Sequence, residues 1–198
     1  MTTLAAPRVL SHILLPRSQT MRRLAMAALV VGFAGLTALA ARITIPVPGT
    51  PVPITGQTFA VLLAGATLGT AAGGASQLLY VATGLFFPVY ADGKQGWEVV
   101  SGATGGYLIG FIAAAAVVGY LAERRQDRSF ATSIPAMLAG SAVIYLFGIP
   151  WLARQADLSA ADAISAGFAP FVIGDAIKLV AAGVLLPTSW KLMGRFTR

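Results

Sequence analysis

Long apolar segments, separated by short polar or glycine- and proline-rich stretches, dominate this chain of 198 residues. Because a helix rises 1.5 Å per residue, about 20 apolar residues cross the roughly 30 Å hydrocarbon core of a bilayer. The pattern therefore predicts an all-α integral membrane protein with six transmembrane helices. The predicted spans are residues 24–41, 57–68, 75–87, 104–121, 131–149 and 168–186, with a glycine-rich break at 69–74 between the second and the third.

A proline-rich stretch joins the first two spans. Residues 43–55 hold four prolines within eight positions, which exclude a helix and favour extended backbone. This stretch forms either a simple loop or a cap folded back over a cavity. We favour the cap, because non-helical backbone at membrane depth is tolerated where it lines a cavity.

The remaining connections are polar. Loops are predicted at residues 88–101, 122–130 and 154–165, and Pro150 is expected to end the fifth span. Residues 1–20 are predicted to be a loose cytoplasmic tail with a turn near residues 9–15. Residues 21–193 form the predicted six-span membrane domain.

Composition supports a membrane protein and argues against several other classes. The chain is 57% hydrophobic and 11% charged, with a mean hydropathy of +0.77, whereas soluble domains carry about 25% charged residues. It has no cysteine and one histidine, His12, so we expect no resident metal or cofactor. No catalytic motif or P-loop is present, so we expect no enzyme, and transport driven by ATP would need a partner.

Charge predicts the orientation in the membrane. The tail, the 122–130 loop and the C-terminal end carry ten Lys and Arg residues, against three on the opposite side. Basic residues are enriched in cytoplasmic loops, so both termini are predicted to be cytoplasmic in a multi-pass plasma-membrane protein. Because the basic residues sit at span edges without interleaved aromatics, the net charge of +7 does not point to nucleic acid.

The strongest candidate chemistry is Asp175 with Lys178, inside the last apolar segment. Residues three apart share one helix face, and each charge within a bilayer costs about 2.5–3.5 kcal/mol, so such residues are a functional-site hypothesis by default. The alternative is an ion pair that only locks helix packing. In the predicted orientation the pair lies below the outer surface, on the side of the proline-rich stretch.

A small amphipathic ligand would suit a cavity that contains this pair. The other candidate binding residues are Thr55, Gln57, Lys94, Trp97, Gly106 and Tyr107. Plain structural roles compete with some of them: Gln57 begins a span, Trp97 lies where interfacial tryptophans occur, and Gly106 belongs to a glycine repeat that packs helices.

Three motifs in order resemble the BioY family of biotin transporters. They are the Pro-Val-Pro stretch followed by Thr55-x-Gln57-Thr58, then Thr104-Gly105-Gly106-Tyr107-Leu108-Ile109-Gly110-Phe111, and Gly174-Asp175-x-x-Lys178. The resemblance covers about residues 21–193. One departure is Ala103, where the family often has proline, which leaves the start of the fourth span open.

The resemblance implies the six-helix fold of the substrate-binding S component of energy-coupling factor (ECF) transporters. Such a subunit binds biotin from outside, with Asp175 and Lys178 contacting its polar groups. The implied partners are a transmembrane T subunit and two ATPase subunits, with Ala34 and Ala38 of the first span as candidate contacts. Two alternatives stay open: an S component for another small vitamin, and a membrane assembly protein without a ligand.

Overall fold

The computed structural model of the chain describes residues 9–196, which fold into nine α-helices with a small β-hairpin. The helices are α1 Ser11–Leu14, α2 Gln19–Ala40, α3 Gln57–Leu68, α4 Thr70–Gly84, α5 Trp97–Ser101, α6 Gly105–Glu123, α7 Phe130–Gln155, α8 Ala160–Gly167 and α9 Val172–Phe196. Two 3-10 turns are η1 Ala91–Gly93 and η2 Ala169–Phe171, and the strands are β1 Thr44–Ile45 and β2 Ile54–Thr55.

Four helical segments of the described chain are long and apolar enough to cross a membrane. They are Gln19–Ala40, Gly105–Glu123, Phe130–Gln155 and Ala160–Met193, the last of which runs through α8, η2 and α9. The helices α3 and α4, with 12 and 15 residues, are shorter than a bilayer crossing needs. The helical membrane fold is thus confirmed, while the number of six spans stays a prediction.

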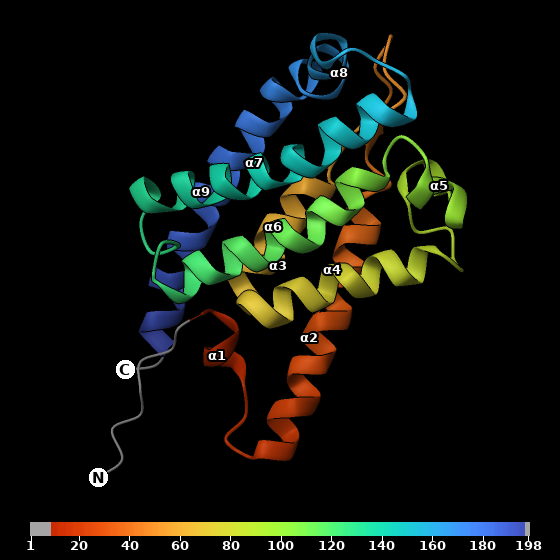
Figure 1. The fold of residues 1–198 in the computed structure, drawn as a ribbon. Helices are drawn as coiled ribbons and strands as arrows, with labels where there is room; N and C mark the ends of the chain where they lie inside the picture. Colours follow the sequence, from red (N-terminus) through yellow and green to blue (C-terminus); the bar gives the residue numbers. More distant parts are fainter. Residues whose placement is uncertain (1–8, 197–198) are drawn as a thin grey trace.

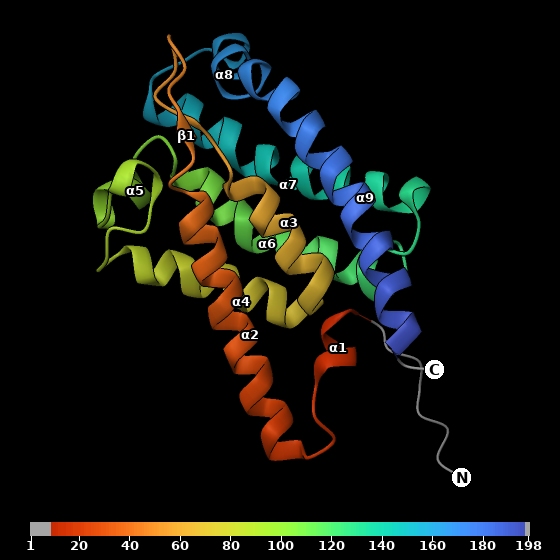
Figure 2. The ribbon, with the colours of Figure 1, turned by 180° about the vertical axis from the view of Figure 1, so that it is seen from behind.

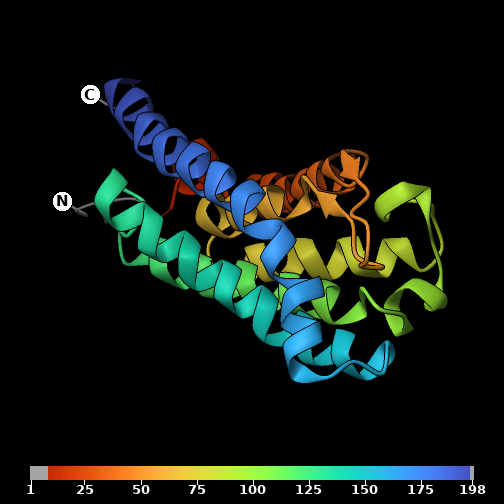
Figure 3. The same ribbon diagram turned by 90° about the horizontal axis from the view of Figure 1, so that it is seen from above.

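The end at which α6 begins is built from the connecting segments (Figures 1 and 2). Figure 3 shows the β1–β2 hairpin, α5 and α8 arranged around the first turns of α6. The two strands pair in antiparallel register, Thr44 with Thr55 and Ile45 with Ile54. They hold the proline-rich stretch as an extended loop, as its prolines predict.

The glycine-rich break was predicted too long. The third span was expected at 75–87, but α4 already begins at Thr70. Only Gly69 interrupts the helix, because its φ of +87° is a conformation that favours glycine. Gly73 stays helical and serves packing instead: a Cβ there would lie 2.8 Å from the Gly65 Cα.

Two further boundary predictions were wrong. The fifth span was expected to end at Pro150, but α7 continues to Gln155, where Leu152 is fully buried and the Trp151 Nε1 donates to the Gly102 carbonyl at 2.8 Å. Packing of this last turn offsets the hydrogen bond that the proline cannot make. Part of the predicted 154–165 loop is helical as well, because the Ser159 hydroxyl caps α8 by accepting from the Asp162 amide.

The expected loose tail is also wrong for residues 9–11, which are buried. Val9 and Leu10 pack into what we call the terminus-side cluster, together with residues such as Leu62, Met137 and Trp190. Figure 2 shows α1 between the beginning of α2 and the end of α9. A second core, the pocket-side cluster, lies toward the hairpin and includes Tyr80, Tyr107, Phe111, Ile144 and Phe171.

Candidate functional site

The acid and base of α9 form an ion pair that is anchored to two other helices. The Asp175 Oδ1 lies 3.1 Å from the Lys178 Nζ, and the two side chains are only 11% and 18% exposed. Lys178 also donates to the Thr58 Oγ1 of α3 at 2.9 Å, and the Tyr145 hydroxyl of α7 donates to the Asp175 Oδ2. Both charges therefore have polar partners, which a buried pair requires.

A hollow lies directly beside this pair, and both Asp175 and Lys178 line it. Its empty space is about 770 Å³, a volume that includes open solvent at the mouth. Among the described residues the lining comprises Pro51, Val52, Pro53, Thr55, Gln57, Thr58, Tyr90, Ala91, Asp92, Lys94, Val99, Thr104, Tyr107, Leu108, Phe111, Ile144, Tyr145, Phe171, Asp175 and Lys178.

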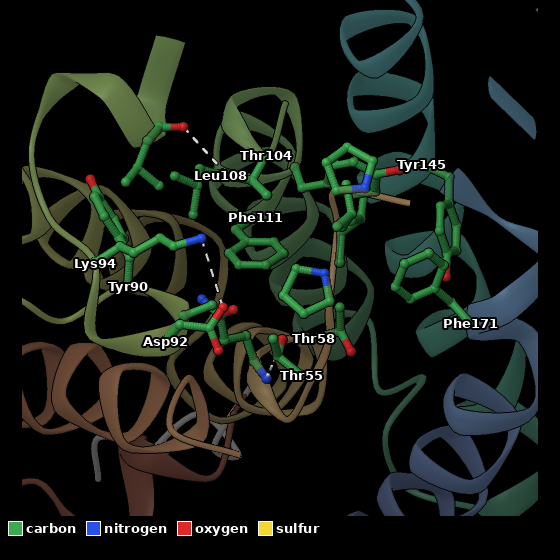
Figure 4. Close-up of a pocket in the computed structure, with 18 of the residues that line it drawn as sticks. Thr55, Thr58, Tyr90, Asp92, Lys94, Thr104, Leu108, Phe111, Tyr145 and Phe171 are labelled. Carbon is green, nitrogen blue, oxygen red and sulfur yellow. Dashed lines mark hydrogen bonds and ion pairs between the residues drawn. The ribbon is translucent and has the colours of Figure 1, made fainter. Parts of the chain in front are cut away.

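The pocket has an aromatic middle between polar groups (Figure 4). Phe111 lies near the centre, with Tyr145 and Phe171 on one side and Tyr90 and Lys94 on the other. Tyr107 adds a wall from α6, and its hydroxyl is occupied by donation to the Gly167 carbonyl at 2.9 Å. Polar groups at the edges and rings between them suit an elongated ligand with an apolar middle.

The proline-rich loop reaches the pocket. Pro51, Val52 and Pro53 belong to its lining, and Val52 is only 6% exposed. Thr55, at the end of β2, lines the pocket next to them. The favoured interpretation of this stretch, a cap folded back over a cavity, requires it to border the cavity, and it does.

A second connection, between α4 and α5, contributes to the open side. Lys94 and Asp92 form a loose pair with 3.8 Å between the Nζ and Oδ2 atoms, and their side chains are 64% and 47% exposed. Tyr90 anchors the segment, because its hydroxyl donates to the Val81 carbonyl at 2.6 Å and its ring is buried. Burial raises the pKa of Tyr90 to about 12, so this hydroxyl keeps its proton at physiological pH.

Of the eight binding residues predicted from sequence, six line this pocket. They are Thr55, Gln57, Lys94, Tyr107, Asp175 and Lys178. The other two lie outside the lining given above. Trp97 is 69% exposed on α5, and Gly106 lies against α7, where a Cβ would come 2.3 Å from the Trp151 Cβ.

Of the two alanines proposed to contact a partner, Ala34 is buried and Ala38 is partly buried within this chain. Ala34 is 7% exposed in the pocket-side cluster, and Ala38 packs against that cluster. Next to them, the Thr37 Oγ1 donates to the Gln77 Oε1 of α4 at 3.2 Å. This face of α2 therefore points toward α4.

Sequence reasoning missed several lining residues, above all Thr58 and Tyr145. Thr58 stands in the motif that drew attention to Gln57, so its neighbour in the motif was an available signal. Tyr145 is one hydroxyl in an apolar span, and only its contact with Asp175, 30 positions away, reveals its role. The remaining missed residues include Tyr90, Asp92, Thr104, Phe111 and Phe171.

The pocket carries groups that can bind a ligand through hydrogen bonds and apolar contacts. Asp175 is an acceptor, Lys178 a donor, and the walls are largely apolar. Within residues 9–196 we find no group of three His, Cys, Asp or Glu side chains that could hold a metal ion. Such an arrangement can bind and orient a small neutral or anionic molecule.

Comparison with known proteins agrees with this picture. A model of the BioY family matches residues 14–195. The biotin transporter BioY of Thermotoga maritima is 42% identical over 154 residues, which is 77% of this chain and 88% of that protein. The biotin transporter BioY of Rhodobacter capsulatus is 40% identical over 153 residues, 71% of this chain and 80% of that protein.

A solved structure shows the same fold. The crystal structure of the S-component for biotin from an ECF-type ABC transporter matches with a TM-score of 0.79 and 23% identity, over 89% of this chain and 95% of that one. The relatives are named as transporters, not enzymes. This multi-pass membrane protein therefore belongs to the BioY family.

Proposed function

We propose that this protein is the biotin-binding S component of an ECF-type vitamin uptake transporter. The observation that carries the proposal is the ion pair of Asp175 and Lys178, held beside a hollow that both residues line. The names of the relatives supply the ligand. A buried pair beside open space leaves hydrogen-bonding capacity for a guest, and biotin has complementary groups.

Biotin combines a ureido ring, an apolar chain and a carboxylate. We place the ureido group at Asp175 and Lys178, where the carboxylate accepts an N–H bond and the ammonium donates to the ureido oxygen. The aromatic walls, including Tyr107 and Phe111, cover the apolar middle. The charged carboxylate lies at Lys94, because that side chain is exposed and the ligand group there keeps part of its hydration.

The remaining predicted residues receive separate roles. Thr55 and Gln57 add polar contacts from β2 and the start of α3. Trp97 and Gly106 make no contact with the ligand in this proposal: Trp97 is exposed at the surface of α5, and Gly106 lets α6 approach α7.

The subunit is oriented with both termini in the cytoplasm of a cell whose plasma membrane it spans. This follows the distribution of Lys and Arg and puts the mouth of the pocket outside. Biotin enters from outside and passes inward with a T subunit and two ATPase subunits, since the chain carries no nucleotide-binding motif of its own.

The partner would contact the uncovered face of α2. Ala34 and Ala38 face the bundle, whereas a Cβ built on Gly32 or Gly35 has no described atom within 4 Å apart from adjacent residues and the nearby backbone of α2 itself. Small residues let another helix approach closely. Gly32 and Gly35 therefore replace the two alanines as the first positions to substitute when complex assembly is tested.

Isothermal titration of the detergent-solubilised protein with biotin tests the proposal. We expect a dissociation constant in the nanomolar to micromolar range and a rise in melting temperature that riboflavin and thiamin do not produce. At about one hundred times the dissociation constant, biotin should stabilise the fold by about 2.7 kcal/mol. Stabilisation by a different vitamin, or by no ligand, would overturn the assignment.

A further inference from the structure

We infer that Tyr80, a residue outside the pocket lining, is a positioning residue that makes Gln57 present its carbonyl oxygen to the ligand. Tyr80 lies in α4 and is 1% exposed. Its hydroxyl reaches the binding pocket through Gln57, which is 5% exposed and belongs to the lining. The inference rests on the proposed function and adds the residue that sets its hydrogen-bond specificity.

Two hydrogen bonds meet at the Tyr80 hydroxyl. The Gln57 Nε2 donates to it at 2.6 Å, and the hydroxyl donates to the Val89 carbonyl at 3.3 Å. The ring is held from the other side by an edge-to-face contact with Tyr90, with 5.7 Å between the ring centroids. The hydroxyl is therefore fixed between the first turn of α3 and the segment after α4.

Counting protons sets the direction of these bonds. A phenol carries one proton, and a backbone carbonyl can only accept. If Tyr80 gives its proton to Val89, it can only accept from Gln57, so the amide NH₂ points toward Tyr80. In the reversed amide the Gln57 oxygen would face Tyr80 and accept the phenol proton. The bond from Tyr80 to Val89 would then be lost, leaving one hydrogen bond in place of two.

The Gln57 Oε1 then remains for the pocket, as an acceptor. Biotin offers N–H groups only in its ureido ring, so the amide oxygen selects for an N–H of that ring. Together, Gln57 and Asp175 supply two acceptors, and Lys178 supplies a donor for the ureido oxygen between them. A ligand without the matching N–H leaves a buried acceptor unpaired, which sites of this kind reject strongly.

The same hydroxyl also connects the site to the mouth. Val89 directly precedes Tyr90, Ala91 and Asp92, which all line the pocket. Through these two hydrogen bonds, Tyr80 fixes the position of the Gln57 amide, which contacts the ligand, relative to the segment that carries Lys94.

The test compares biotin with biotin methylated at each ureido nitrogen in turn. For the unaltered protein we expect methylation of the ureido nitrogen whose N–H donates to Gln57 to lower the affinity at least about tenfold. In Tyr80→Phe the ring stays but the amide is free to rotate. We expect biotin affinity to fall about fivefold and the methylation penalty at that nitrogen to shrink at least about threefold.

A double-mutant cycle separates positioning from a general structural effect. In a Gln57→Met background, Tyr80→Phe should change neither biotin affinity nor the methylation penalty further. Ser76→Ala is the matched control, because Ser76 lies one turn earlier on α4, is buried, and donates to Gly73 with no bond to Gln57. We expect its methylation penalty to equal that of the unaltered protein.

Three outcomes overturn the inference. The first is an unchanged methylation penalty in Tyr80→Phe, and the second is that the affinity losses of Tyr80→Phe and Gln57→Met add fully. The third is that the unaltered protein discriminates between biotin and methylated biotin no better than Gln57→Met does. The last comparison does not depend on Tyr80→Phe being stable. If the unaltered protein binds no biotin, the proposed function itself fails, which the first titration detects separately.

Discussion

Two buried carboxylates in this protein have similar polar partners. Asp175 is 8% exposed and Asp127, in the connection between α6 and α7, is 1% exposed. Each has a basic neighbour in sequence, Lys178 or Arg128. Each also accepts a hydrogen bond from an aromatic side chain of another element, the Tyr145 hydroxyl in one case and the Trp190 Nε1 in the other.

The two differ in what lies beside them. Asp175 borders a hollow, whereas Trp190, the partner of Asp127, is packed in the terminus-side cluster with Val9 and Leu10. The Arg128 guanidinium lies 3.4 Å from the centroid of the Trp190 ring and covers that side. A buried ion pair is thus a candidate binding site only where space adjoins it. Where packed side chains fill that space, the ion pair stabilises the contact between elements instead.

Matched substitutions should separate the two carboxylates most strongly. Asp175→Asn should weaken biotin binding at least about tenfold, because Lys178 loses its countercharge and the ligand loses a charged acceptor. Asp127→Asn should leave the affinity within about twofold, since its side chain lies outside the pocket lining. Isothermal titration measures both, and equal losses in the two variants would contradict the comparison.

Exchanging the charges of the pocket pair sharpens the same point. The double variant Asp175→Lys with Lys178→Asp keeps an ion pair three residues apart but moves the donor and the acceptor. We expect a folded, monodisperse protein in size-exclusion chromatography whose biotin affinity falls at least about tenfold. Retained binding in this variant would favour the packing-pair interpretation and a membrane assembly protein.

Removing the aromatic donor of each carboxylate should separate the two sites in the same way, with smaller effects. Tyr145→Phe removes the hydroxyl that orients Asp175, and we expect about a fivefold loss of biotin affinity, roughly 1 kcal/mol. Trp190→Phe should leave binding unchanged and lower the free energy of unfolding by about 1–3 kcal/mol, because a buried carboxylate loses a donor. Titration and thermal melting read the two effects separately.

The smallest expected effect is a dependence on pH. Burial raises the pKa of the Asp127 carboxyl above its ordinary value, although Trp190 and Arg128 oppose the shift. The folded chain then holds this proton more tightly than the unfolded chain, so the free energy of unfolding falls as pH rises from about 4 through the raised pKa.

Asp127→Asn should remove that part of the pH profile, because its side chain does not ionise. Melting temperatures of the unaltered protein and the variant, measured in steps from pH 4 upward, give the difference. Asp157→Asn is the control, since Asp157 is exposed beyond the end of α7. A profile that changes equally in both variants would show that Asp127 is not its source.

Local chemistry was enough to predict some features from residues alone. The bounds of α3 were predicted as residues 57–68, because Gly69 marks its end, and extended backbone was predicted where the prolines stand. Asp175 and Lys178 stood out because charges are costly within an apolar helix. Gln57 and Tyr107 joined them through motifs, and the pocket lining includes both.

Other features depend on contacts between residues far apart in the chain. Gly73 looked like a second break, yet α4 runs through it because Gly65 lies against it. Pro150 looked like a helix end, yet α7 passes it because Trp151 bonds to Gly102. In both cases tertiary packing overrode a local preference that costs only about 1–3 kcal/mol.

By itself, the sequence determined that the chain is a helical membrane protein and which charges stand out in it, because hydropathy and the cost of a buried charge depend on composition and spacing. The tertiary structure alone decided that Asp175 borders empty space while Asp127 does not. That difference arises from how α3, α6, α7 and α9 approach one another, and the volume left between packed helices is a property that no single segment carries.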